Sequence, residues 1–215
     1  MRADIAVKIC GLRDAATLDA AVLAGARFIG FNFFPKSPRY VTLAEATELA
    51  AGIPVGVAKV GLLVDPDDAT LDAVTAAVPL DFVQLHGHET PARVSEVRAR
   101  TGLPVIKAVG VGDAEDLPAL DAFGAVSDML LVDTKPPKGA ALSGGTGLTF
   151  DWGLIAGRRW PVAWMLAGGL TSANVAQAVA RTGARIVDVS SGVERAKGVK
   201  DAGMIADFIR AAQGG

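Results

Sequence analysis

Eight short apolar segments recur along the sequence, and their number and character restrict the folds that it can adopt. They are residues 7–10, 28–33, 59–64, 82–85, 105–109, 129–132, 162–166 and 186–189. Most are nearly continuous in apolar character and do not alternate with polar residues. This pattern is typical of parallel strands that are covered on both faces.

Segments with the apolar spacing of amphipathic helices separate these strands. Residues suited to helix N-caps are Asp14, Thr42, Asp67, Thr90, Ser172 and Asp201, and glycines suited to helix C-termini are Gly25, Gly102 and Gly183. Eight strand–helix units of roughly 27 residues would fill the 215-residue chain. We therefore predict a single α/β domain over residues 1–215, a (β/α)8 TIM barrel, with a doubly wound open sheet as the alternative.

The composition argues against several classes of protein. Hydrophobic residues make up 51% and charged residues 20%, with a net charge of -2, which disfavours disorder and a nucleic-acid partner. No apolar run reaches the ~18 residues that span a bilayer, so no membrane association is expected. The single cysteine excludes an intramolecular disulfide, and the first residues lack the apolar stretch of a signal peptide, so we expect a cytoplasmic protein.

Two ionisable side chains stand at the ends of predicted strands. Cys10 ends the first segment, and Asp133 follows the sixth. In a parallel barrel the carboxyl ends of all strands share one mouth, where active sites of this architecture are built. A lone cysteine can also be a small buried hydrophobe, and Asp133 can cap a helix or pair with Lys135. Their positions favour a thiol and a carboxyl group that face each other across a substrate.

Four polar residues interrupt the apolar segments: Lys8, Gln84, Lys107 and Asp188. We expect them to point into the barrel, although some could face the layer between strands and helices, where an unpaired charge is equally costly. The first and last strands of a closed barrel are neighbours, so Lys8 and Asp188 should form an ion pair beneath the site. The lysine should also lower the pKa of Cys10 and allow its thiol to act as a base.

Glycine-bearing turns follow the seventh and eighth segments. The first contains Gly168 and Gly169, and the second contains Ser190, Ser191 and Gly192. In many barrels these two loops and a helix N-terminus bind phosphate through backbone N–H groups. Each turn alone is more often a tight turn with a cap, but the pair predicts a small-molecule phosphorylated substrate.

The connection from 134 to 149 is long and rich in proline and glycine, and we interpret it as a mobile cover over the barrel mouth. Its segment 144–147 could contact an anion or act as a hinge. His86 and His88 lie in one short loop with no third ligand at recognisable spacing, which argues against a metal site. His86 is instead expected to act as a cap or to contact the substrate.

Several short motifs occur in the order found in a known enzyme family. They are KICG at 8–11, GFNF at 30–33, PKSPRY at 35–40, VQLHG at 83–87, VDTK at 132–135, GGTG at 144–147, TFDW at 149–152, AGGL at 167–170 and DVSSGVE at 188–194. The chain closely resembles phosphoribosylanthranilate isomerase, the tryptophan-pathway enzyme, over essentially its whole length. The resemblance implies an Amadori rearrangement of N-(5-phosphoribosyl)anthranilate to 1-(2-carboxyphenylamino)-1-deoxyribulose 5-phosphate, with no cofactor and no metal.

The resemblance also implies roles for individual residues. Asp133 would be the general acid that protonates the furanose ring oxygen, so that the ring opens to a Schiff base. Cys10 would be the general base that takes the C2′ proton to form an enolamine. Arg39 would bind the anthranilate carboxylate, a task suited to the paired donors of a guanidinium. Gln84, His86 and the two glycine turns complete the expected substrate site.

Two positions depart from the family pattern, and two other functions are compatible with the motifs. Leu148 replaces a polar or basic residue expected in many relatives, and His88 replaces a common acidic one.

A dual-function barrel could also isomerise the related aminoaldose of histidine biosynthesis, but those enzymes use two aspartates, and Cys10 favours the anthranilate substrate. A non-catalytic phosphosugar-binding protein would be expected to lack Cys10 or Asp133. Either a monomer or a homodimer is compatible with the sequence.

Overall fold

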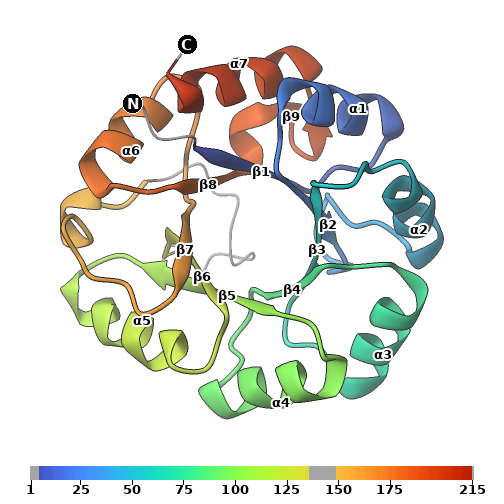
Figure 1. The fold of residues 1–215 in the computed structure, drawn as a ribbon, viewed down its shortest axis with the longest axis horizontal. Coiled ribbons are helices and arrows are strands. Elements are labelled where there is room, and N and C mark those ends of the chain that lie inside the picture. The colour runs from blue at the N-terminus through green and yellow to red at the C-terminus, as the bar shows by residue number, and fades with distance from the viewer. Residues whose placement is uncertain (1–4, 136–148, 215) are drawn as a thin grey trace.

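The computed structural model describes residues 5–135 and 149–214, and its centre is a closed barrel of parallel strands (Figure 1). The barrel strands are β1 (Ala6–Cys10), β2 (Phe28–Asn32), β3 (Ala58–Leu63), β4 (Phe82–Leu85), β5 (Val105–Val111), β6 (Met129–Thr134), β7 (Ala163–Leu166) and β8 (Ile186–Val189). Each pairs with the next in the chain, and β8 pairs in parallel with β1. The predicted TIM barrel is confirmed, and its closure excludes a doubly wound open sheet.

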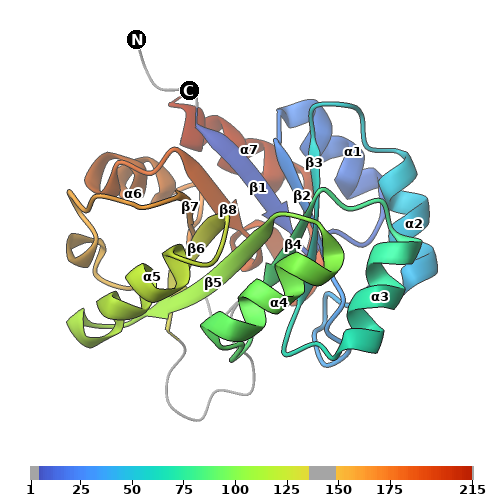
Figure 2. The same ribbon diagram turned by 60° about the horizontal axis from the view of Figure 1, so that its bottom comes forward.

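Helices surround the ring of strands in both ribbon views (Figures 1 and 2). They are α1 (Ala15–Ala24), α2 (Leu43–Ala51), α3 (Asp68–Ala77), α4 (Pro91–Thr101), α5 (Leu117–Gly124), α6 (Val175–Thr182) and α7 (Ala202–Gln213). Short 3-10 helices are η1 (Ala114–Asp116), η2 (Trp152–Leu154) and η3 (Ser191–Val193). An antiparallel hairpin of β9 (Glu194–Ala196) and β10 (Val199–Lys200) follows β8.

Local sequence signals explain where most helices begin and end. The predicted N-caps whose side chains accept a backbone hydrogen bond from their helix are Asp14, Thr42, Asp67, Thr90 and Asp201. The predicted glycines that end helices in the left-handed conformation are Gly25, Gly102 and Gly183. The prediction for Ser172 is wrong, because Asn174 occupies the N-cap of α6 and its side chain accepts from the backbone N–H of Thr171.

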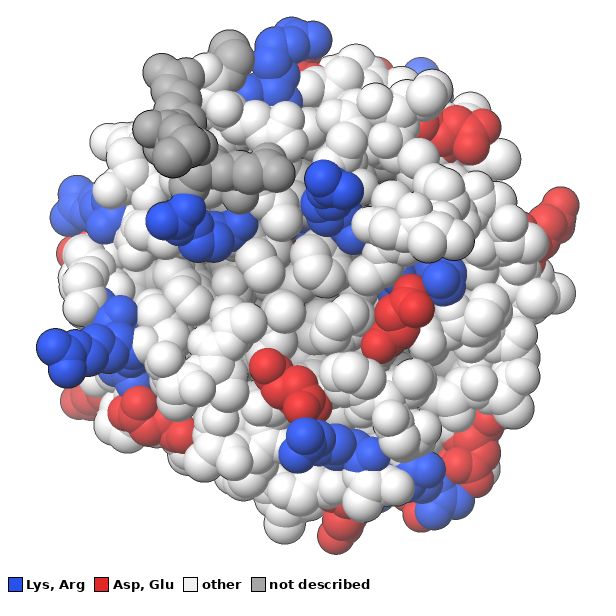
Figure 3. Space-filling model, viewed as in Figure 1, with Lys and Arg blue, Asp and Glu red and all other residues white. Residues whose placement is uncertain are grey.

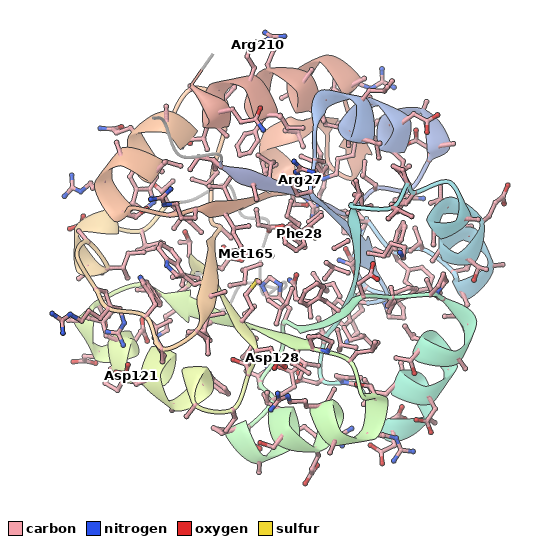
Figure 4. The ribbon with its side chains drawn as sticks, in the orientation of Figure 1. Arg27, Phe28, Asp121, Asp128, Met165 and Arg210 are labelled. Carbon is pink, nitrogen blue, oxygen red and sulfur yellow. The ribbon has the colours of Figure 1, made fainter. Side chains whose placement is uncertain are left out.

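Apolar side chains pack on both sides of the strand wall. The larger cluster lies between strands and helices, and a smaller one fills the barrel. Figure 4 shows Phe28 and Met165 inside the ring of strands, and Val60, Ile106 and Leu131 belong to the same interior cluster. Side chains alternate along a strand, so these residues identify the inward positions of their strands.

Lys8 is fully buried inside the barrel. Its Nζ donates a hydrogen bond of 2.7 Å to Oδ1 of Asp188, which lies directly opposite in the β1–β8 register. The predicted ion pair is therefore confirmed. Gln84 is also fully buried, on the same face of β4 as Phe82, which packs against the interior cluster.

Lys107 lies on the other side of the wall, and the expectation that it points inward is wrong. Its neighbours in β5, Ile106 and Ala108, belong to the interior cluster, so Lys107 faces the helices. Its Nζ lies 2.7 Å from Glu89 and 5.3 Å from the centroid of the Phe123 ring in α5. The charge is thus paired within the strand–helix layer, and it does not contribute to the barrel interior.

The surface view agrees with the near-neutral composition. Figure 3 shows lysine, arginine, aspartate and glutamate side chains mixed around this face, with no extended area of one sign. Within the part of the chain that the structure describes, no helix is both long enough and apolar enough to cross a membrane.

Candidate active site

A pocket opens at the carboxyl ends of the barrel strands. It is lined by Cys10, Asn32, Phe34, Ser37, Arg39, Leu62, Val64, His86, Asp133, Ala167, Gly168, Gly169, Leu170, Asp188, Val189, Ser190, Ser191 and Gly192. All the predicted site residues except Gln84 are among them. Asn32 and Ser37 also line the pocket, although they were not among the predicted site residues. Both lie within motifs that carry the family resemblance, which is the signal that could have identified them.

Cys10 ends β1 and is 4% exposed, and the backbone beside it leaves room for the thiol. A Cβ at Gly30 of β2 would lie 3.0 Å from the Cys10 sulfur and 3.2 Å from Nζ of Lys8. A side chain larger than hydrogen at Gly30 would therefore displace the Cys10 thiol and the Lys8 ammonium. Because residue 30 is glycine, the thiol can lie against β2, next to the Lys8 ammonium.

The pKa of the Cys10 thiol is raised in the structure, whereas the sequence predicted that it would be lowered. Burial raises the pKa of Cys10; Lys8 lowers it, but the Asp188 carboxylate opposes Lys8 and raises it again. Burial also favours the neutral form of Lys8, yet Asp188 and Cys10 outweigh burial and raise the lysine pKa above its usual value. The expected lowering of the thiol pKa is therefore wrong, because burial outweighs the effect of Lys8 and the Asp188 carboxylate also opposes it.

Asp133 stands at the end of β6 and contacts His86. Its Oδ1 accepts a hydrogen bond of 2.7 Å from the backbone N–H of Thr134, and its Oδ2 lies 3.2 Å from Nε2 of His86. The other ring nitrogen of His86 lies 3.2 Å from Nε2 of Gln84. Gln84 therefore lies behind His86 and orients the ring toward Asp133, and it is not part of the pocket wall.

The two predicted glycine turns lie together at the pocket. Gly168 has a φ of +84°, and a Cβ there would lie 2.2 Å from Oγ1 of Thr134. A Cβ at Gly192 would lie 1.9 Å from the carbonyl oxygen of Leu170. Only glycine fits these two positions. Gly168 packs against the end of β6, and Gly192 packs against the backbone of the turn after β7, an arrangement suited to binding an anion through N–H groups.

Arg39 reaches the pocket from the connection between β2 and α2. Its Nε and Nη2 donate to the two carboxylate oxygens of Glu194 at 2.6 Å and 2.9 Å, and the arginine is 6% exposed. Glu194 belongs to the motif at 188–194, but its partnership with Arg39 is not predictable from the sequence, since no pattern links it to a residue 155 positions earlier in the chain.

Two expectations for the connection after β6 lie outside the described residues. They are its interpretation as a mobile cover, with the possible anion contact at 144–147, and the effect of Leu148. Within residues 5–135 and 149–214, no group of three or more histidine, cysteine, aspartate or glutamate side chains lies close enough to bind a metal ion.

Comparison with known proteins identifies the family. The model of the family described as N-(5'phosphoribosyl)anthranilate (PRA) isomerase matches residues 7–211. The chain belongs to this isomerase family. The N-(5'-phosphoribosyl)anthranilate isomerase of Paracoccus denitrificans (strain Pd 1222) is 66% identical over 205 residues, which is 95% of each chain.

Solved structures of phosphoribosylanthranilate isomerases share the barrel. The enzyme from Thermotoga maritima is 36% identical with a TM-score of 0.88, over 98% of this chain and 99% of that one. Another isomerase structure, 34% identical with a TM-score of 0.85 over the same shares, is a complex with reduced 1-(o-carboxyphenylamino)-1-deoxyribulose 5-phosphate. The Thermotoga enzyme is dimeric, and monomers of it have been generated.

Proposed function

We propose that this chain catalyses the family's isomerisation of N-(5-phosphoribosyl)anthranilate in tryptophan biosynthesis, with Asp133 as general acid and Cys10 as general base. The main support is that one pocket is lined by this thiol, this carboxyl group and the paired glycine turns at 168–169 and 190–192. A phosphorylated aminosugar needs an anion site and an acid–base pair within reach of one another.

The acid step uses Asp133. Its carboxyl group donates a proton to the furanose ring oxygen, the C1′–O bond breaks, and the ring opens to a Schiff base. His86, at 3.2 Å from Oδ2, is placed to hold the carboxyl group toward the pocket. The carboxylate that remains is the conjugate base that the rest of the reaction must reprotonate.

The base step uses Cys10. A buried thiol with a raised pKa is mostly protonated at neutral pH, but its thiolate is correspondingly a stronger base. Ring opening creates a cationic Schiff base in the pocket, and a nearby positive charge favours the thiolate. Lys8 adds a second cation next to the sulfur. The thiol proton passes to solvent, and the thiolate then takes the C2′ proton, which gives the enolamine. Tautomerisation gives the ketose product: C1′ gains a proton from the thiol, and the C2′ hydroxyl proton returns through solvent to the Asp133 carboxylate, which restores the thiolate and the acid.

The test is the loss of anthranilate-type fluorescence when the purified protein meets freshly generated phosphoribosylanthranilate. Asp133→Asn and Cys10→Ser should each lower kcat by roughly 10²-fold or more, because each removes a positioned acid or base. Asp121→Asn, which changes an exposed carboxylate paired with Arg158, should retain wild-type turnover.

The assay also separates the alternatives. Near-wild-type kcat in a folded Asp133→Asn or Cys10→Ser protein would remove that residue's role. Tight binding of the substrate without turnover by the wild type would favour a phosphosugar-binding protein. Turnover of the histidine-pathway aminoaldose at a comparable rate would establish the dual-substrate alternative.

A further inference from the structure

Three charged side chains form a buried cluster at and behind the pocket wall. Glu194, at the start of β9, accepts from Arg39 through both carboxylate oxygens, and its Oε1 also accepts from Nζ of Lys200 at 2.9 Å. The Lys200 and Glu194 side chains are 1% and 4% exposed. Arg39 lines the pocket, whereas Glu194 and Lys200 do not. Glu194 is therefore linked to the pocket through its partners.

The same cluster reaches the turn after β8. Nζ of Lys200 donates to the carbonyl oxygen of Ser190 at 2.8 Å and lies 3.2 Å from its hydroxyl. That hydroxyl donates in turn to the carbonyl oxygen of Cys10 at 3.1 Å. A single carboxylate is thus connected through hydrogen bonds to the guanidinium on one side of the pocket and to the start of the glycine turn on the other.

The cluster has two cations and one anion. Burial raises the pKa of Glu194, but Arg39 and Lys200 outweigh burial and lower it to about 2, so Glu194 stays ionised. Burial and the neighbouring Arg39 lower the pKa of Lys200, and Glu194 offsets that shift only in part. Of the two cationic residues it is Arg39 that lines the pocket, where a guanidinium suits an anionic substrate.

Close backbone packing restricts the position of the arginine. A Cβ at Gly198, in the β9–β10 turn, would lie 2.7 Å from the carbonyl oxygen of Pro38, and the Gly198 N–H donates to Glu194 at 3.0 Å. A Cβ at Gly11 would lie 2.7 Å from Cδ of Arg39. The β9–β10 hairpin therefore packs against the loop that carries Arg39, and Gly11 packs against the Arg39 side chain.

A guanidinium has five N–H donors, and Glu194 uses only the pair on the Nε side. The two terminal nitrogens retain a second, end-on pair of donors, which matches a carboxylate in the same way. Arg39 can therefore be fixed by Glu194 and bind a second carboxylate at once.

We propose that Glu194 is a positioning residue: it fixes Arg39 with the end-on donor pair toward the pocket, so that the carboxylate of the anthranilate ring is recognised. This inference rests on the proposed function, in which the substrate carries that carboxylate. Lys200 links the same anchor to Ser190, so the two anionic ends of the substrate are set by one buried cluster.

The test compares two ligands by calorimetry. One is reduced 1-(o-carboxyphenylamino)-1-deoxyribulose 5-phosphate, and the other is the same compound without the ring carboxyl group. Glu194→Gln should lower affinity for the first roughly tenfold, the scale of one charge-assisted hydrogen bond, and affinity for the second by about twofold or less. In turnover assays Glu194→Gln should raise KM, while kcat stays within about threefold of the wild-type value. Glu194→Asp should restore part of the lost affinity for the carboxylated ligand.

A double-mutant cycle shows whether Glu194 acts through the arginine. Arg39→Ala should also remove the preference for the carboxylated ligand, and adding Glu194→Gln to it should change that preference no further. Glu89→Gln is the matched control, because Glu89 is an equally buried glutamate paired with a lysine on the outside of the barrel. It should leave the ratio of the two affinities unchanged.

The outcomes separate this inference from the proposed function. A wild type that does not bind the carboxylated ligand would overturn both. If Arg39→Ala retains the carboxylate preference, the assigned role of the arginine is wrong. If Arg39→Ala removes the preference but Glu194→Gln leaves it intact or strengthens it, Glu194 is not a positioning residue and only competes for the guanidinium.

Discussion

The two buried strand lysines, Lys8 on the inside of the barrel and Lys107 on its outside, are paired in different ways. Lys8 pairs with Asp188, 180 positions away, and the two meet because β8 closes onto β1. Lys107 has partners within 22 positions, the carbonyl oxygens of Leu85 and Gly87 and the carboxylate of Glu89. The inner pair therefore depends on closure of the whole barrel, whereas the outer one can form within a single β4–α4–β5 unit.

The two pairs also differ in what lies beside them. Lys8 is next to the Cys10 thiol and affects its pKa. Lys107 contacts an aromatic ring and the loop after β4, outside the pocket. We therefore expect Lys8 to affect both stability and catalysis, and Lys107 to affect stability alone.

The largest expected effect is from Lys8→Met. It leaves the buried Asp188 carboxylate without its cation, and removing one partner of a buried pair typically costs about 3–5 kcal/mol of the free energy of unfolding. We also expect kcat to fall, because the thiolate loses its neighbouring ammonium. Urea unfolding and the fluorescence assay measure the two effects, and a stable variant with wild-type kcat would contradict both.

A smaller loss is expected from Lys107→Met. Glu89 keeps hydrogen bonds from the backbone N–H groups of Asp65 and Gly87 after the lysine is removed. The free energy of unfolding should therefore fall by roughly 1–3 kcal/mol, with kcat within about threefold of wild type. A loss of kcat as large as in Lys8→Met would show that the outer pair also controls the chemistry.

The smallest effect is a shift in the titration of the single thiol. Because burial raises the pKa of Cys10, its alkylation by iodoacetamide should accelerate only at a pH above the range in which an exposed cysteine thiol ionises. Lys8→Met should move this profile to still higher pH, and Lys107→Met should leave it unchanged. A profile centred near neutral pH would show that the thiol is activated in the free protein.

The same shifts have a consequence for stability. The folded-state pKa values of Cys10 and Lys8 both lie above their unfolded values, so folding retains protons on both groups. Their contribution is complete at neutral pH and is lost as the pH rises through the folded-state values. Stability should accordingly decline in alkaline solution, less steeply in Lys8→Met.

Much of the site could be read from the chain, because a strand that ends on an ionisable residue places that residue at the barrel mouth. Cys10 and Asp133 are predicted in this way, the two glycine turns are predicted from their place after the seventh and eighth strands, and all of them lie in one pocket. The direction of the thiol pKa could not be read, since it depends on the balance of burial, Lys8 and Asp188. The partnership of Arg39 with Glu194 and Lys200 was also missed, because it joins a loop after β2 to a hairpin after β8.

The order of the elements, the parallel barrel and the side chains at strand ends are all encoded in local signals, because they follow from apolar runs and turn residues. Which face of a strand is the interior depends on the assembled fold, as the opposite placements of Lys8 and Lys107 show. Alternation specifies which residues share a face. Since both faces of a barrel strand are covered by apolar groups, only the closed ring distinguishes inside from outside.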